Sequence, residues 1–114
     1  MALTTHVLDT SRGRPADAVA IELHAIRAGG RAAVASALTN RDGRTDVPLA
    51  AALEQGVYEL TFHVADYFRR AGVLLDDPPF LDVVIIRIGI ANPSDRYHVP
   101  LLVSPYGYST YRGS

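Results

Sequence analysis

Cysteine is absent from this chain of 114 residues. Its absence excludes disulfides, thiolate catalysis and cysteine-ligated zinc. The formal net charge is only −1, so no excess of positive charge favours binding to nucleic acid or to an anionic membrane surface. No apolar run approaches the length of about 18 residues that a membrane-spanning helix requires. A protein without nucleic-acid or membrane partners is therefore expected.

The start of the chain, residues 1–6, has neither the basic residues nor the apolar run of a secretory signal. We therefore expect a soluble cytoplasmic protein. The length suits a single domain spanning residues 1–114. A domain of this size buries roughly two-thirds of the surface of its extended chain, which is enough for one modest core.

Turn-forming residues divide the chain at short, fairly regular intervals. They lie at residues 11–15, 29–30, 40–43, 76–79, 92–94 and 104–107. Between them, residues 19–25 and 57–64 alternate apolar and polar side chains, which is typical of half-buried strands. Many short strands in a chain of this length predict a mainly β protein with a sandwich architecture.

One segment, residues 66–72, has a helical pattern. Asp66 is a plausible N-cap, because its carboxylate can accept hydrogen bonds from the first free N–H groups of a helix. Gly72 is a plausible end, because glycine readily adopts the left-handed conformation that terminates helices. The sequence thus predicts one short helix in an otherwise β-rich fold.

Two predicted strands, residues 83–90 and 99–103, are apolar on both faces. In a simple antiparallel sandwich the outer face of a strand should be polar unless something covers it. A loop or the short helix could provide that cover. Contact between subunits is the alternative that we favour, because monomers rarely expose a large contiguous apolar patch.

Two histidines lie in phase on predicted strands. If Thr5 and Val99 point into the sandwich, both His6 and His98 stand on its outer surface, because side chains alternate along a strand. Imidazoles among small and apolar side chains are typical of a small-molecule pocket. His24 and His63, in contrast, lie among polar residues and are predicted to be solvated.

Five segments carry a more specific pattern and follow one another along the whole chain. They are residues 3–10 (LTTHVLDT), 40–44 (NRDGR), 97–102 (YHVPLL), 104–110 (SPYGYST) and 111–114 (YRGS). With these segments the chain resembles the 5-hydroxyisourate hydrolases, the enzyme branch of the transthyretin superfamily. The resemblance implies a transthyretin-like β-sandwich of two four-stranded sheets with one short helix after the fifth strand.

The resemblance also implies an assembly and a site. Four subunits would form a homotetramer, with active sites at the contact between dimers. Matching the motifs residue by residue implies that the catalytic residues are His6, Arg44 and His98. The same match implies that these three bind substrate together with Tyr111, Arg112, Gly113 and Ser114.

The implied reaction opens the six-membered ring of 5-hydroxyisourate at an amide-type C–N bond, giving 2-oxo-4-hydroxy-4-carboxy-5-ureidoimidazoline. A neutral imidazole can take a proton from water near neutral pH. The bidentate guanidinium of Arg44 would bind substrate oxygens and stabilise the developing oxyanion. Tyr111 and Ser114 would supply shape and hydrogen bonds, and Arg112 would anchor the terminus. Whether His6 or His98 is the base stays open.

Three alternatives compete with this hypothesis. A zinc site would need a third protein ligand beside His6 and His98; Asp9 and Asp46 are near in sequence, but no recognised ligand spacing is present. We therefore expect no metal and no cofactor. A small-ligand carrier of the same superfamily would use the same channel without chemistry, but it would have no need of two histidines and a terminal Arg-Gly-Ser. A sandwich that only binds other proteins is the third alternative.

Overall fold

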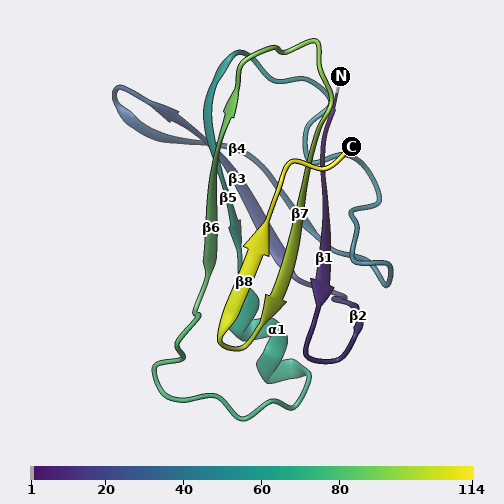
Figure 1. The fold of residues 1–114 in the computed structure, drawn as a ribbon. Coiled ribbons are helices and arrows are strands. Elements are labelled where there is room, and N and C mark those ends of the chain that lie inside the picture. The colour runs from purple at the N-terminus through teal and green to yellow at the C-terminus, as the bar shows by residue number, and fades with distance from the viewer. Residues whose placement is uncertain (1) are drawn as a thin grey trace.

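The computed structural model describes residues 2–114. Its elements form two four-stranded sheets, ordered β2-β1-β7-β8 and β4-β3-β5-β6, with one helix between β5 and β6 (Figure 1). The bounds are β1 Leu3–Asp9, β2 Arg14–Pro15, β3 Ala20–Arg27, β4 Gly30–Leu38, β5 Gly56–Phe62, α1 Val64–Arg70, β6 Val84–Ile90, β7 Tyr97–Ser104 and β8 Gly107–Thr110. The prediction of a sandwich of two four-stranded sheets with one short helix after the fifth strand is confirmed.

The core lies between the two sheets and is built by alternation along their strands. In β1 and β3 every second residue is buried, as the period-two patterns predict. Leu23, Leu60, Val7 and Leu101, one from each of four strands, have no exposed surface. Burying such side chains contributes about 1.5–3 kcal/mol each. The inward set is therefore strongly specified, and with it the set of side chains that face outward.

The first and seventh strands are parallel neighbours although they are far apart in sequence. Thr4 lies opposite His98, and His6 lies opposite Pro100. Val99 is buried and His98 is half-buried, so the outward orientation predicted for both histidines is confirmed. This register brings the two outer faces that carry imidazoles side by side.

The helix begins earlier than predicted. It starts at Val64, and His63 occupies the N-cap position without a side-chain capping bond. Asp66 as N-cap is therefore wrong; it lies in the first turn and forms an ion pair with Arg69 at 3.5 Å. Gly72 follows the helix with φ +86°, which confirms the predicted end.

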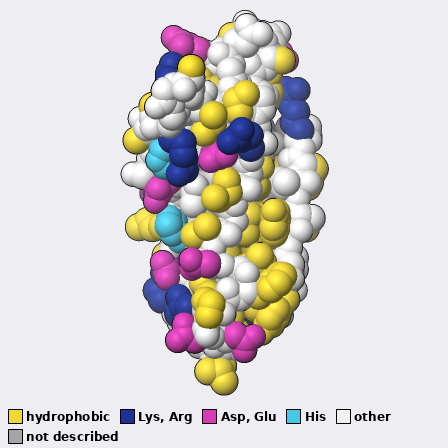
Figure 2. Space-filling model, turned by 90° about the vertical axis from the view of Figure 1, so that its left-hand side faces the viewer, with side chains coloured by type: hydrophobic (Ala, Val, Ile, Leu, Met, Phe, Trp, Pro, Cys, Tyr) yellow, Lys and Arg dark blue, Asp and Glu magenta, His cyan; other side chains and the backbone are white. Residues whose placement is uncertain are grey.

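The two strands that were predicted to be apolar on both faces, β6 and β7, differ in the structure. On β7, Pro100 is buried, because Thr110 and Gly113 lie against it. On β6, at the edge of its sheet, the outward positions are Ile85, Arg87 and Gly89. Ile85 is 47% exposed, and Arg87 beside it forms an ion pair with the Glu59 carboxylate at 2.8 Å. Figure 2, viewed from the side on which β6 lies in Figure 1, shows hydrophobic side chains interspersed with basic and acidic ones along the molecule. Cover by the chain itself thus explains β7, whereas the prediction that β6 is apolar on both faces is wrong, because Arg87 stands on its outward face.

Candidate active site

The His98 side chain is held by the neighbouring strand. Nδ1 of its ring lies 2.8 Å from the hydroxyl oxygen of Thr4, the residue directly opposite in the parallel register. The ring is half-buried on the outer face of the sheet. Because both ends of this contact stand on paired strands, the ring position is fixed by the sheet itself.

The C-terminal tail packs against the other side of the same ring. The Gly113 N–H donates to the His98 carbonyl oxygen at 2.8 Å, forming an isolated β-bridge. A Cβ at position 113 would lie 2.5 Å from Cδ2 of His98, closer than real Cβ contacts allow. Only glycine lets the tail lie this close to the imidazole.

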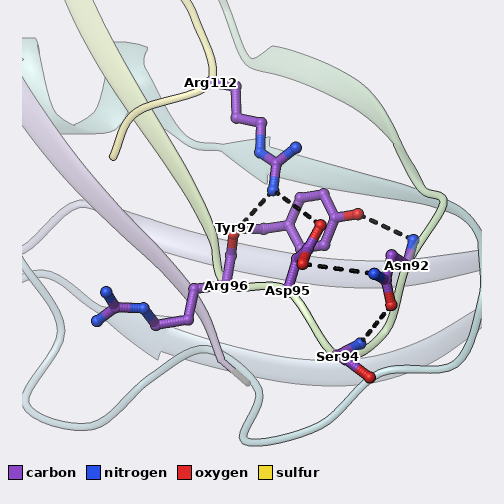
Figure 3. Close-up of polar contacts among 6 residues, drawn as sticks. All are labelled: Asn92, Ser94, Asp95, Arg96, Tyr97 and Arg112. Carbon is purple, nitrogen blue, oxygen red and sulfur yellow. Dashed lines mark hydrogen bonds and ion pairs between the residues drawn. The ribbon is translucent and has the colours of Figure 1, made fainter.

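Arg112 fastens the tail to the loop between β6 and β7 (Figure 3). Its guanidinium lies 4.1 Å from the centre of the Tyr97 ring, donates to the Arg96 carbonyl at 3.0 Å and approaches the Asp95 carboxylate at 3.8 Å. Cation–π and hydrogen-bond contacts of this kind each contribute about 1 kcal/mol. The Arg96 side chain points away from this cluster (Figure 3).

Arg44 is presented by a tight turn in the segment that connects β4 to β5. The Asn40 carboxamide oxygen accepts hydrogen bonds from the N–H groups of Asp42 and Arg44 at 2.9 and 3.3 Å. Gly43 has φ +75°, and a Cβ there would collide with the Val7 carbonyl oxygen. The Val7 N–H donates to the Gly43 carbonyl at 2.8 Å and ties the turn to β1. This turn therefore places Arg44 beside the face that carries His6.

A cleft of about 780 Å³ forms where the turn, the two strands and the tail meet. Of the predicted site residues, it is lined by Arg44, His98, Arg112, Gly113 and Ser114. The cleft is also lined by four residues that the sequence did not suggest as site residues: Thr4, Asp95, Arg96 and Tyr97. Alternation placed Thr4 on the same face as His6, but its position beside His98 depends on a pairing between strands that local patterns do not contain.

Two predicted site residues do not line this cleft. His6 lies next to it: Gly43 packs against its ring, and the Arg44 charge is close enough to lower its pKa. Tyr111 is 61% exposed and lines a separate groove of about 370 Å³ with Ile86 and Ile88 of β6. Within one chain, Tyr111 therefore does not reach the side chains grouped around His98.

Both site histidines favour the neutral form. Partial burial lowers the pKa of His98, and the positive charges of Arg44 and of His6 lower it further. Partial burial and the Arg44 charge also lower the pKa of His6, against a raising effect of Asp42 through its backbone hydrogen bond and its charge. Neutral imidazoles beside a guanidinium can accept a proton, while the guanidinium offers two parallel donors to an oxyanion.

No cluster of three or more metal-ligating side chains occurs among residues 2–114. Asp9, one of the two carboxylates considered as a third zinc ligand, is fully buried elsewhere. It accepts hydrogen bonds from the Ser11 hydroxyl at 2.6 Å and the Tyr67 hydroxyl at 2.7 Å. Burial and the hydrogen bond to Asp9 raise the pKa of Tyr67 to about 12. Asp9 therefore ties β1 to α1.

None of the helices in this part of the chain is long and apolar enough to cross a membrane.

Fold and site together define a β-sandwich with an outer-face cleft that combines imidazole, guanidinium and backbone groups. The model of the HIUase/Transthyretin family matches residues 3–113. The chain belongs to this family, which confirms the resemblance seen in the motifs.

Particular relatives are similar over nearly their whole length. A protein named 5-hydroxyisourate hydrolase 2 from Rhizobium meliloti is 56% identical, over 98% of this chain and 95% of its own. The structure of Klebsiella pneumoniae 5-hydroxyisourate hydrolase is 37% identical with a TM-score of 0.83, covering 99% of this chain and 98% of that one. Sea bream transthyretin in complex with thyroxine is 27% identical with a TM-score of 0.87, covering 99% and 95%.

Proposed function

We propose that this chain is an enzyme that hydrolyses 5-hydroxyisourate as one hydrolase domain. It opens the six-membered ring at an amide-type C–N bond and gives 2-oxo-4-hydroxy-4-carboxy-5-ureidoimidazoline. The observation that carries the proposal is the meeting of His98, Arg44 and the Gly113 backbone in one cleft, where partial burial and the Arg44 charge lower the pKa of the imidazole. The names of the full-length relatives support the choice of substrate.

In the proposed reaction, an imidazole removes a proton from water as the water oxygen attacks the ring carbonyl carbon. The carbonyl π electrons move to oxygen, giving a tetrahedral oxyanion. When the oxyanion collapses, the C–N bond breaks, and the leaving nitrogen takes a proton from the imidazolium. The products are a carboxylic acid, which ionises at neutral pH, and a free N–H. General acid–base catalysis of this kind contributes typically 10²–10⁴-fold.

Arg44 serves as substrate ligand and oxyanion donor in this proposal. Its side chain is exposed to the cleft and forms no ion pair within residues 2–114, so both donor edges of the guanidinium are available. A preorganised oxyanion donor is worth about 2.7–4 kcal/mol of transition-state stabilisation.

The proposed working form is a cytoplasmic homotetramer with its active sites at the contact between dimers. Two observations support an assembly: the exposure of Ile85 on β6 and of Tyr111 in the tail, and the position of Tyr111 outside the cleft of its own chain. In an oligomer, the site of one chain can be completed by side chains of another, which would give Tyr111 and His6 a route to the substrate.

The structural likeness to a thyroxine-binding transthyretin favours one competing function, a carrier of small ligands. The lining of this cleft argues for chemistry instead, because three arginines (Arg44, Arg96 and Arg112) and the His98 imidazole are among the residues that line it. A carrier would bind its ligand and release it unchanged.

One experiment separates the two functions. Urate is oxidised freshly by urate oxidase, purified protein is added, and decay of the unstable intermediate is followed by ultraviolet absorbance. A hydrolase accelerates the decay in proportion to enzyme concentration, and product analysis shows the ring-opened carboxylate. Decay at the spontaneous rate would refute the proposal and leave the carrier function standing.

A further inference from the structure

The contact between Thr4 and His98 stands apart from the other threonine contacts along the same pair of strands. Thr5 donates to the Val99 carbonyl at 2.7 Å, and Thr10 donates to the Val103 carbonyl at 3.2 Å. Both of these hydroxyls donate to backbone carbonyl groups of the neighbouring strand and so help to hold the two strands together. The Thr4 hydroxyl instead contacts a ring nitrogen, Nδ1 of His98, at 2.8 Å. Within residues 2–114 this is its single hydrogen bond.

The ring of His98 is held from two directions. Thr4 contacts Nδ1 on the side of β1, and the Gly113 Cα packs against Cδ2 on the side of the tail. Nε2 makes no hydrogen bond within the described part of the chain. Since the ring lines the cleft, Nε2 is the nitrogen left for a molecule bound there.

A neutral imidazole carries its proton on one nitrogen only, and the direction of the hydrogen bond at each nitrogen corresponds to one tautomer. A threonine hydroxyl can donate or accept, so it can stabilise either tautomer. A base that removes a proton from water through Nε2 needs the ring proton on Nδ1. In that tautomer the Thr4 oxygen accepts from Nδ1–H, and its own proton is free to point to solvent.

We infer that Thr4 is a positioning residue that keeps the proton of His98 on Nδ1 and directs the Nε2 lone pair into the cleft. This inference rests on the proposed function, in which an imidazole accepts a proton from water. It further assigns that step to His98 and makes β1, through one hydroxyl, the element that sets its tautomer.

Three variants test the inference. Thr4→Val keeps the shape of the side chain and removes the hydroxyl, so kcat should fall about fivefold to tenfold, the typical effect of one hydrogen bond, while KM changes little. Thr4→Ser restores the hydroxyl and should recover most of kcat. Thr10→Val removes the matched hydroxyl at the far end of the same strands and should leave both constants near wild type.

A second readout does not depend on turnover. Nitrogen-15 NMR of labelled protein above the titration range should show His98 protonated on Nδ1 in the wild type and shifted toward the Nε2–H tautomer in Thr4→Val. An Nε2–H tautomer in the wild type would overturn the inference, as would an unchanged kcat in a folded Thr4→Val protein. If circular dichroism shows that Thr4→Val does not fold, the tautomer of wild-type His98 and the kcat of Thr4→Ala test the inference instead. A protein without hydrolase activity would refute the proposed function, whereas the tautomer measurement would still stand.

Discussion

Each sheet of the sandwich has a pair of histidines outside the core, and the two pairs have different surroundings. His24 and His63 belong to the β4-β3-β5-β6 side, where charged neighbours bind them: His63 contacts the Glu22 carboxylate at 2.9 Å and His24 contacts Arg31 at 3.3 Å. Figure 2 shows histidine side chains among acidic and basic ones on the surface it faces. These imidazoles are held by ordinary surface interactions.

On the opposite sheet, His6 and His98 have no carboxylate bound to them within residues 2–114. They are partly covered by the turn that carries Arg44 and by the tail that carries Gly113. Partial burial and a nearby positive charge lower the pKa of both. The residue type is the same for the two pairs, and His6, His98 and His24 all stand at outward positions of strands, so the cover supplied by distant segments makes the difference.

The largest expected difference between the pairs is in catalysis. His98→Ala and Arg44→Ala should each lower turnover of 5-hydroxyisourate by about a hundredfold or more, because each removes a base or an oxyanion donor. His24→Ala and His63→Ala are the matched controls and should retain near wild-type rates in the same absorbance assay. Near wild-type turnover in either site variant would remove that residue from the mechanism.

A smaller loss should follow from displacing the tail. Gly113→Ala places a methyl group 2.5 Å from Cδ2 of His98, so either the tail or the ring must move. A shift of about 1 Å in a catalytic group can cost up to about a hundredfold, and we expect a loss between tenfold and a hundredfold in kcat. Gly29→Ala, in open space within another hairpin, is the control. Equal activities of the two variants, both folded, would show that the tail contact does not position the ring.

The electrostatic difference can be isolated by comparing two arginines of one turn. Arg44→Gln should raise the pKa of His6 and of His98, because the positive charge that disfavours the imidazolium is gone. Arg41→Gln, which removes an exposed charge from the same turn, should raise neither. Proton NMR titration of the imidazole signals measures both variants, and equal titration curves in the two would contradict the assigned cause.

The same lowered pKa values predict how stability depends on pH. An imidazole whose pKa is lower in the folded state than the unfolded value near 6.5 binds fewer protons when folded. Stability contributed by these groups is therefore present above that pH and is lost as the pH falls through 6.5 toward the folded pKa. In Arg44→Gln this loss should be smaller, as melting temperatures across that range would show.

The smallest effect is expected on the other sheet. Glu22→Gln removes the carboxylate that His63 contacts, and activity should not change. The hydrogen bond from His63 lowers the pKa of Glu22 below 4.5, so any stabilisation is present above that value and disappears as the pH falls further. Exposed ion pairs contribute little, so melting temperatures of variant and wild type should nearly coincide. A large loss of activity would mean that the two faces are coupled.

Much of the fold was predictable because it depends on local alternation. The buried sets of β1 and β3 follow from period-two patterns, and burial on one face makes such patterns reliable. The start of α1 was not predictable from capping, since His63 forms no side-chain bond to the first turn. Asp66 was mistaken for the N-cap because it is an acidic residue in the first turn of the helix.

The candidate site was predictable only in part. Motif resemblance selected His98, Arg44 and the tail, and the structure places these in one cleft. It also places Tyr111 in a different groove and His6 beside the cleft rather than on its wall. The role proposed for Thr4 required knowledge of which strand lies next to β7.

By itself, the sequence determined which side chains face the core and which face outward, because a strand has a period of two and apolar burial is strongly favoured. It also determined where the turn can approach the Val7 carbonyl and where the tail can approach the His98 ring, since Gly43 and Gly113 stand where a Cβ would collide. Only the tertiary structure decided that β1 and β7 are parallel neighbours with Thr4 opposite His98, residues 94 positions apart in sequence. Register between distant strands arises from the packing of the whole sandwich, and no local pattern of residues encodes it.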